Sequence, residues 1–283
     1  MDGITKATGK KNDQRSADAV FEIDFSKNIS RAFPAPVFIH GHYLKFSRKH
    51  CQSRWHCSRC KGRGCDSCGG SGSNYPSIEE ELGKVFIPAF LAKECTLHAS
   101  GREDVDVRTL GTGRPFIMAL SHPKKRKADM KNLEKQFENN ESVRVLGLRM
   151  VGKGFVDLVC DSHFEKEYSA LVSADRQLTA EDAEKIKELE GKEISQQTPT
   201  RVLSRRTDML RTRKIHRISA SLEAGGRLRL TILAEAGTYI KELIHSDVGR
   251  TTPSISALLG CNAKCDELDV VGIRDFFLET AAD

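Results

Sequence analysis

The chain has 283 residues, of which 39% are hydrophobic and 30% are charged, and its formal net charge is +6. This is the composition of a globular protein, and no run approaches the roughly 20 apolar residues that a transmembrane helix requires. Residues 1–15 are polar and lack the apolar core of a secretory signal peptide. The sequence therefore predicts an intracellular protein, cytoplasmic or nuclear, without a membrane partner.

The positive charge is concentrated in two segments. Residues 201–217 carry seven basic side chains against the single acid Asp208, and residues 124–127 are all basic. A solvated basic surface would account for the net charge alone. Clustered Lys and Arg side chains favour a phosphate backbone, however, because they release its counterions. The clustering therefore favours an RNA partner.

The first part of the chain predicts a tail and two strands ahead of an unusual loop. Residues 1–19 are rich in Lys, Asp, Ser and Gly, which is typical of a disordered tail. Residues 21–25 alternate between apolar and acidic side chains, and residues 37–39 are apolar, so both predict strands. Residues 51–74 combine five glycines with cysteines. They predict a loop-like insertion that something other than an apolar core holds together.

The remainder alternates irregularly between strand and helix signals. A helix begins after Ser77, a natural N-cap with Glu80 at the capping-box position. Hairpins are more common than crossovers, so the order predicts an α+β fold with a mainly antiparallel mixed sheet flanked by helices. The further predicted elements are a strand–turn–strand over 91–119, a short helix over 131–140, a bent strand or hairpin over 143–161, a strand over 168–174, a helix over 179–191, a hairpin over 214–234 turning at 225–226, a helix over 238–248, a helix capped by Thr252 and Pro253, and a strand over 268–273.

An acidic segment lies within the predicted strand–turn–strand unit of residues 91–119. Glu103, Asp104 and Asp106 alternate with Arg102 and Arg108. A glycine ahead of them permits a tight turn, and the arginines would keep a carboxylate ionised. An ionised, oriented Asp can be a nucleophile, a general base or a metal ligand, and a surface turn with compensating charges is the alternative.

Four cysteines form two Cys-x-x-Cys pairs, each followed by glycines. They are Cys57, Cys60, Cys65 and Cys68. Such pairs are typical metal ligands, and four thiolates suit a tetrahedral zinc ion. The spacing of four residues between the pairs is shorter than in most zinc ribbons. The pattern predicts structural zinc, with an iron–sulfur cluster or no metal as the alternatives.

Several segments resemble, in one order, the Pus10 family of pseudouridine synthases. The most distinctive begins with Gly-Arg-Glu-Asp at residues 101–104, which is also similar to the Gly-Arg-Thr-Asp loop of other tRNA pseudouridine synthases. The resemblance spans roughly residues 36–275. Its other segments are 110–116, 166–172 with Lys-Glu-Tyr, 198–206, 237–242 with Gly-Thr-Tyr-Ile-Lys, 245–250 and 267–270.

The resemblance implies a pseudouridine-synthase fold, no catalytic cofactor, and roles for particular residues. Asp104 falls on the family's catalytic Asp and would act as the nucleophile, at the base or at the ribose. Tyr168 would stack on a flipped-out uracil, and Lys241 would neutralise and orient Asp104. The expected supporting residues are Tyr239 by a hydrogen bond, Leu268 as an apolar wall, Arg102 and Arg108 as phosphate contacts or braces of the loop, and Arg205 and Arg206 in substrate binding.

The resemblance further implies a tRNA substrate, modified at uridine 55 or 54 of the TΨC arm. The expected domains are a tail over 1–19, a Cys-rich N-terminal segment over 20–75 and a catalytic domain over 76–283. Family members normally carry a long N-terminal RNA-binding region, so the chain is either a compact form or lacks that region. Two alternatives remain: a non-catalytic RNA-binding protein with the same fold, and a nuclease holding Mg²⁺ on Glu103, Asp104 and Asp106.

Overall fold

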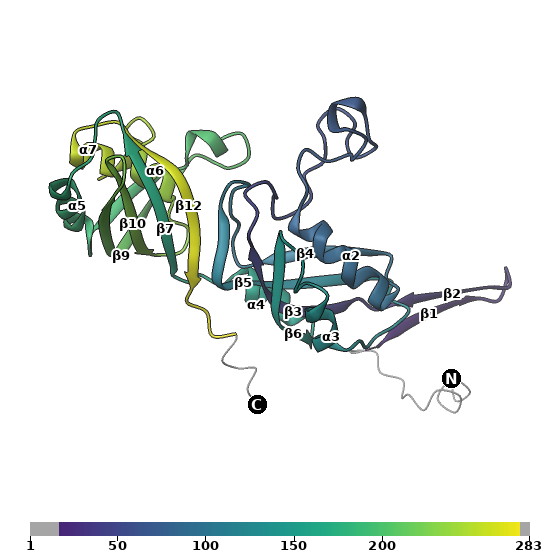
Figure 1. Cartoon of the computed structure of the whole chain (residues 1–283). Helices are drawn as coiled ribbons and strands as arrows, with labels where there is room; N and C mark the ends of the chain where they lie inside the picture. The colour runs from purple at the N-terminus through teal and green to yellow at the C-terminus, as the bar shows by residue number, and fades with distance from the viewer. Residues whose placement is uncertain (1–16, 278–283) are drawn as a thin grey trace.

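The computed structural model describes residues 17–277 and consists of one large sheet, one separate hairpin and short helices (Figure 1). The large sheet has ten strands in the order β11-β8-β9-β10-β7-β12-β5-β3-β6, with β4 added beside β5. The strands are β1 Ala19–Asp24, β2 Ile29–Pro34, β3 Val37–Lys45, β4 Glu94–Ala99, β5 Arg108–Ser121, β6 Val143–Val151, β7 Lys166–Ala174, β8 Glu193–Gln197, β9 Leu210–Glu223, β10 Arg227–Ala234, β11 Thr251–Thr252 and β12 Ala263–Ile273.

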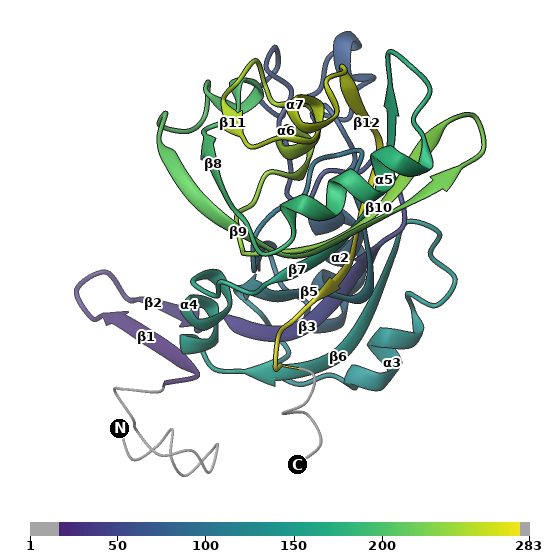
Figure 2. The same ribbon diagram turned by 90° about the vertical axis from the view of Figure 1, so that its left-hand side faces the viewer.

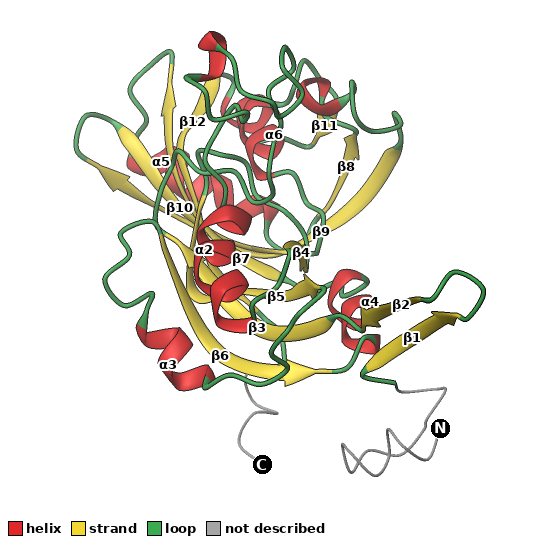
Figure 3. Ribbon diagram, turned by 90° about the vertical axis from the view of Figure 1, so that its right-hand side faces the viewer, coloured by secondary structure: helices red, strands yellow, loops and turns green. Residues whose placement is uncertain are grey.

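Helices are short and lie against the sheet or at its ends (Figure 3). Among the strand pairs of the described residues, β5 and β12 alone run parallel, and every other pair is antiparallel. The predicted α+β class with a mainly antiparallel mixed sheet is therefore confirmed. The helices are α2 Ile78–Phe90, α3 Met130–Lys135, α4 Gly154–Cys160, α5 Ala180–Ile186, α6 Ile240–His245 and α7 Ile255–Leu259, with 3-10 turns η1 Asp66–Cys68, η2 Lys187–Leu189 and η3 Thr200–Val202.

The N-terminal part of the sheet has its own apolar core under α2. The Ser77 hydroxyl accepts a hydrogen bond from the Glu80 backbone N–H, so the predicted N-cap is confirmed. From there α2 buries Leu82, Phe86 and Phe90 against β3, β5 and β6. Each of these side chains is fully buried, which stabilises the fold by about 1.5–3 kcal/mol per side chain.

A second core fills the C-terminal part of the sheet, where α5, α6 and α7 cover β7, β9, β10 and β12 (Figure 2). The predicted hairpin of β9 and β10 turns at Gly225 and Gly226, both with positive φ that glycine adopts without strain. The two cores meet where β5 lies beside β12, so the ten strands join two separately packed bodies.

Residues 51–75 form a projecting arm, named here the cysteine arm. It leaves the sheet after β3 and returns at α2, and Cys51 and Ser77 form an isolated bridge at its base. A second bridge joins His56 to Ser73 higher up. Figure 1 shows the arm in blue above the β3–β6 body, whereas the β1–β2 hairpin projects from the far end. The predicted loop-like insertion is confirmed.

Two local predictions were wrong. The segment 143–161 is strand β6 followed by helix α4, not a long strand or hairpin, because α4 turns Val159 into a small core beside Ile117. Helix α7 is capped by Ser254, whose hydroxyl accepts from the Ala257 N–H, so Thr252 is not the N-cap.

The division into a tail, a Cys-rich segment and a catalytic domain stays a prediction. Residues 1–16 of the predicted tail lie outside the described residues, and Ala19 begins β1. Strand β3, from the predicted N-terminal segment, pairs with β5 and β6 in the large sheet. Within residues 17–277, every helix is too short or too polar to cross a bilayer.

Candidate active site

The Asp104 loop, residues 100–107, lies where the two bodies of the sheet join. It connects β4 to β5, and β5 pairs with β12 immediately after it, Arg108 opposite Asp269. The Arg108 guanidinium holds the Asp269 carboxylate in a bidentate pair, with N–O distances of 3.0 and 2.6 Å. These hydrogen bonds raise the pKa of Arg108. Arg108 therefore links the start of β5 to β12.

A buried ion pair supports the first part of this loop. The Arg114 Nε lies 2.8 Å from the Glu103 carboxylate, and both side chains are 1% exposed. The Tyr43 hydroxyl donates to the same carboxylate at 2.9 Å, and burial raises the pKa of Tyr43 well above its ordinary value. Arg114 also donates to the Ser100 carbonyl at 2.7 Å. At Gly101 φ is +81°, and a Cβ there would lie 3.1 Å from the Arg114 guanidinium.

The backbone around Asp104 is fixed by a buried lysine. Lys45 Nζ donates to the carbonyls of Asp104 and Val105, at 3.0 Å each, and to that of His50 at 2.7 Å. Val107 anchors the end of the loop because it is buried in the C-terminal core. With its backbone held from both sides, Asp104 presents its side chain in a defined direction.

Two cations hold the Asp104 carboxylate. Arg201 Nη1 donates to one oxygen at 2.9 Å, and Lys241 Nζ lies 3.3 Å from the other. Lys241 also donates to both oxygens of Asp106 at 2.8 Å. Burial disfavours the Asp106 carboxylate, but the Lys241 ammonium outweighs burial and lowers the pKa of Asp106. The Asp104 side chain is 38% exposed, so a substrate can reach it.

Arg201 was not among the predicted site residues. It lies near the start of the segment named here the Arg201 loop, residues 199–209, and its guanidinium also holds the Glu242 carboxylate at 2.7 and 3.3 Å. Burial opposes the Arg201 charge, but the carboxylates of Glu242 and Asp104 raise the pKa of Arg201. Glu242 is buried in α6 and therefore fixes the guanidinium that faces Asp104. In the sequence, Arg201 was marked by the basic cluster and by the family resemblance of residues 198–206, and neither assigned it a role.

Tyr168 and Leu268 are both buried in the C-terminal core. Both are 7% exposed and belong to the core that also holds Val107 of the Asp104 loop. Burial raises the pKa of Tyr168 to about 12, while the charge of Arg114 acts in the opposite direction. Tyr168 is therefore a neutral phenol near the buried ion pair that supports Asp104.

The remaining predicted residues lie on the Arg201 loop, on α6 or on the exposed surface. Tyr239 is the N-cap residue of α6, and its hydroxyl accepts from Arg206 Nη1 at 3.3 Å. The Arg205 guanidinium lies 4.2 Å over the ring of Trp55 in the cysteine arm. Arg102 is exposed. Asp104 and Lys241 are thus in direct contact, whereas Arg205 and Arg206 lie on the Arg201 loop and Tyr239 lies at the start of α6.

The acidic trio does not form a cation site. Glu103 is buried in the pair with Arg114, and Asp106 faces Lys241. Within residues 17–277, the cysteines of the arm are the only group of three or more potential ligands that converges. This arrangement disfavours the nuclease alternative, because a Mg²⁺ site requires several carboxylate oxygens around one point.

The four arm cysteines can hold a metal ion. Their sulfur atoms all lie within 4.8 Å of one another, at 3.8–3.9 Å for three of the pairs. Four sulfurs at about 2.3 Å from a tetrahedral zinc lie about 3.8 Å apart, so the distances fit that ion. The backbone N–H of Gly64 donates to the Cys60 sulfur, and those of Cys65 and Gly72 donate to the Cys68 sulfur. The bonds from Cys65 and Gly72 lower the pKa of Cys68 to about 6. The sulfurs are far too distant for disulfides.

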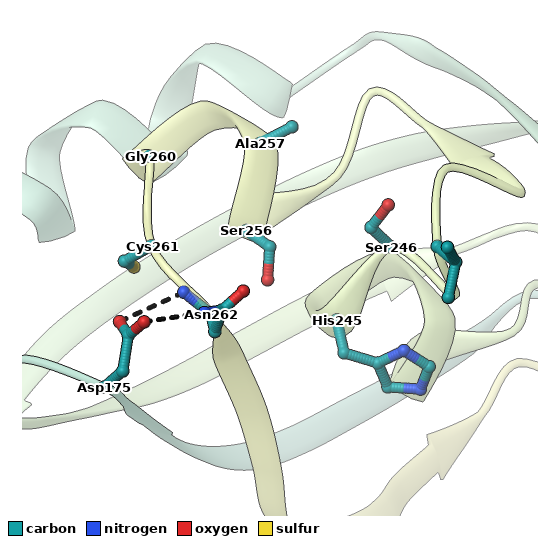
Figure 4. Close-up of a pocket in the computed structure, with 9 residues that line it drawn as sticks. Asp175, His245, Ser246, Ser256, Ala257, Gly260, Cys261 and Asn262 are labelled. Atoms are coloured by element: carbon teal, nitrogen blue, oxygen red, sulfur yellow. Dashed lines mark hydrogen bonds between the residues drawn. The ribbon is translucent and has the colours of Figure 1, made fainter.

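A surface depression elsewhere on the fold contains neither the residues around Asp104 nor the arm cysteines. It has a volume of about 570 Å³ and is lined by residues of α6, α7 and their flanking loops (Figure 4). Asp175 accepts two hydrogen bonds from Asn262 at its edge, at 3.1 and 2.7 Å. None of the residues around Asp104 lines it.

Comparison with known proteins identifies the family. Residues 38–274 match the sequence model described as Pus10, C-terminal. The chain is 40% identical over 242 residues to the tRNA pseudouridine synthase Pus10 of Methanocaldococcus jannaschii, covering 85% of this chain and 53% of that protein. It is 38% identical over 273 residues to the protein of the same name from Methanopyrus kandleri, covering 93% of this chain and 63% of that protein.

A relative of the same name from Archaeoglobus fulgidus is 41% identical over 242 residues, covering 84% of this chain and 67% of that protein. The chain thus spans about half to two thirds of the length of these relatives. Among solved structures, it is similar to a chain of a Cbf5-Nop10-Gar1 complex, with a TM-score of 0.44 and 20% identity over 82% of this chain and 48% of that chain. The family match accords with the expected pseudouridine-synthase fold, and the chain belongs to the Pus10 C-terminal family.

Proposed function

We propose that the chain isomerises uridine to pseudouridine in a structured RNA, with Asp104 as the nucleophile. The observation that carries the proposal is the Asp104 carboxylate, held at 2.9 Å by Arg201 and at 3.3 Å by Lys241 and still open to solvent. The names of the relatives, tRNA pseudouridine synthases, support the reaction class. The buried pairs around Asp104 support a fixed nucleophile rather than a mobile surface acid.

The reaction changes connectivity without an outside reactant. The bond between C1′ and N1 of uridine breaks, a bond between C1′ and C5 forms, the hydrogen of C5 leaves as a proton, and N1 gains a proton. The uracil must leave its stack before Asp104 can reach it. Asp104 would attack either the base or the ribose, and no redox or group-transfer cofactor is required by this balance.

The neighbouring residues receive matching roles. Arg201 and Lys241 aim the Asp104 carboxylate, which attacks in its ionised form. Tyr168 and Leu268 provide an apolar wall on which a flipped uracil packs, and stacking on an aromatic ring contributes about 1–3 kcal/mol. Arg206 and Tyr239 would position the RNA beside it.

Loss of tritium from C5 tests the reaction directly. RNA transcribed with uridine tritiated at C5 should release tritium to water on incubation with the protein, in buffer containing EDTA. No release from RNA that the protein binds would overturn the proposal and favour the non-catalytic RNA-binding reading.

The substrate we propose is tRNA, with uridine 55 or 54 of the TΨC arm as the target. The names of the relatives support tRNA, and the position follows from the family resemblance alone. An enzyme that modifies tRNA would work inside the cell, in the cytoplasm or the nucleus.

Arg201 gives the first prediction. We expect Arg201→Met to lower kcat by up to about 100-fold with little change in KM, because a misdirected nucleophile slows chemistry rather than binding. Arg201→Lys should recover part of the loss, since it keeps the charge but cannot bridge Asp104 and Glu242. Steady-state tritium release measures both constants. A rise in KM alone would instead make Arg201 an RNA contact.

The cysteine arm gives the second prediction, a structural zinc ion. We expect the purified chain to contain one zinc ion, measured by elemental analysis, and the double variant Cys65→Ser/Cys68→Ser to contain none. Cys160→Ser removes an exposed cysteine outside the cluster and should keep the ion. Visible absorbance with bound iron would identify a cluster instead, and wild-type protein without metal would contradict the prediction.

A further inference from the structure

The cysteine arm is rooted in the candidate active site. The Gln52 side-chain amide, at the base of the arm, donates to the Gly101 carbonyl at 2.9 Å and to the Tyr43 hydroxyl at 2.8 Å. Gly101 lies in the Asp104 loop, and Tyr43 supports that loop through Glu103. The arm therefore rises directly from the scaffold that holds the nucleophile (Figure 1).

Two aromatic side chains lie together on this arm, outside the apolar cores of the described residues. Trp55 is the single tryptophan of the chain, and its ring lies 5.7 Å from that of Tyr75, which is 42% exposed. The backbone N–H of Asn74 donates to the Trp55 carbonyl at 2.9 Å, so the outgoing and returning segments of the arm are joined beside the two rings. An aromatic pair held at the surface by a paired backbone is a preformed surface for stacking.

The Arg201 loop connects this pair to Asp104. Arg201, near its start, pairs with Asp104, and Arg205 further along places its guanidinium 4.2 Å over the Trp55 ring. Arg206 follows and reaches the Tyr239 hydroxyl. One short segment thus contacts Asp104, the cysteine arm and the start of α6, in that order along the chain.

We propose that Trp55 is a stacking platform for an unpaired base of the RNA, next to the base that enters the Asp104 site. This inference rests on the proposed function. Stacking of a base on an indole is stronger than an exposed contact between an arginine and the same ring. The base therefore displaces Arg205, and the freed guanidinium pairs with an RNA phosphate, for which its planar fork is suited.

The charge of the arm agrees with this ligand. Between residues 51 and 75 there are four basic side chains and one acidic side chain: Arg54, Arg59, Lys61, Arg63 and Asp66. The Arg201 loop adds Arg201, Arg205 and Arg206 against Asp208. A basic surface with interleaved aromatic rings is the arrangement that binds single-stranded nucleic acid.

Tryptophan emission reports the contact directly because the chain has no other tryptophan. The wild-type chain is titrated with an unmodified tRNA transcript and with a short oligouridine, while anisotropy of the labelled RNA measures binding. We expect saturable quenching of Trp55 emission with the same midpoint as the anisotropy change. Binding without a change in emission, or no binding of either RNA, overturns the proposal.

Variants then separate stacking from charge. Trp55→Ala should weaken RNA binding by about fivefold to 100-fold, and Trp55→Phe should retain most of the affinity. The logarithm of the RNA-binding constant falls linearly with the logarithm of the salt concentration, and the slope reports the number of phosphate contacts. Arg205→Gln should reduce this slope by about one contact, whereas Trp55→Ala should leave it unchanged. Phe25→Ala truncates an aromatic side chain that is 88% exposed in the β1–β2 turn and should change nothing.

The outcome is distinguishable from that of the proposed reaction. If RNA quenches Trp55 emission but no tritium is released, the Trp55 proposal is supported and the proposed isomerase activity is rejected. If tritium is released, but RNA leaves the emission of the wild-type chain unchanged and Trp55→Ala binds RNA with full affinity, the isomerase activity is supported and the Trp55 proposal is rejected. Circular dichroism shows whether Trp55→Ala folds, and the wild-type titration decides the matter if it does not.

Discussion

Replacing Asp104 with Asn should abolish pseudouridine formation while the protein still folds and binds RNA. The amide cannot act as the nucleophile, so we expect the rate of tritium release to fall by about 10³-fold or more. Asn keeps the shape of the side chain, and the backbone contacts of Lys45 to the Asp104 loop do not involve the carboxylate. Circular dichroism and RNA anisotropy should therefore match those of the wild-type chain.

Asp106→Asn is the matched control. It lies two residues away in the same loop and is bound by the same Lys241, at 2.8 Å. Because we assign no bond making to Asp106, its replacement should lower the rate by no more than about tenfold. Equal losses in the two variants would contradict the assignment of Asp104, and a larger loss in Asp106→Asn would reverse it.

Arg114→Met should be the most destabilising single change beneath the site. It removes the partner of Glu103 in a pair whose side chains are both 1% exposed, and it leaves a buried carboxylate with Tyr43 as its remaining donor. We expect the free energy of unfolding to fall by about 3–5 kcal/mol, because an uncompensated buried charge loses its hydration without an ionic partner. Urea unfolding measures this difference.

An exposed ion pair provides the comparison. Lys187 and Glu184 lie 2.7 Å apart, with side chains 52% and 71% exposed. Lys187→Met removes a cationic partner at the surface, an ammonium group in place of a guanidinium group, and should alter the free energy of unfolding by no more than about 0.5 kcal/mol. A loss for Arg114→Met as small as this would show that the pair does not hold the loop.

Local signals in the sequence predicted much of the fold. The Ser77 cap of α2 and the Gly225-Gly226 turn between β9 and β10 depend on neighbouring residues alone, and both are present. Helix α4 was missed because its short apolar run resembles the strand that precedes it. The parallel joint of β5 and β12 could not be predicted locally, since Arg108 and Asp269 are 161 residues apart.

In the candidate site, too, the sequence marked individual residues but not the contacts between residues far apart in the chain. Asp104, Tyr168 and Lys241 were found by resemblance to a family, because the residues alone allowed a surface turn. The pairing of Arg201 with Asp104 joins residues 97 apart, and Glu242 anchors it from a third segment. The burial of Glu103 depends on Tyr43, 60 residues earlier, so nothing in the acidic segment indicated which carboxylate would face the solvent.

Mapping pseudouridine in an unmodified tRNA transcript tests the central claim most directly. The transcript is incubated with the wild-type chain in buffer containing EDTA, labelled chemically at pseudouridine and read by primer extension. We predict a new stop in the TΨC arm, at position 55 or 54, that Asp104→Asn does not produce. Intact, bound RNA without a stop would contradict the proposed activity, and cleavage of the RNA would instead indicate a nuclease.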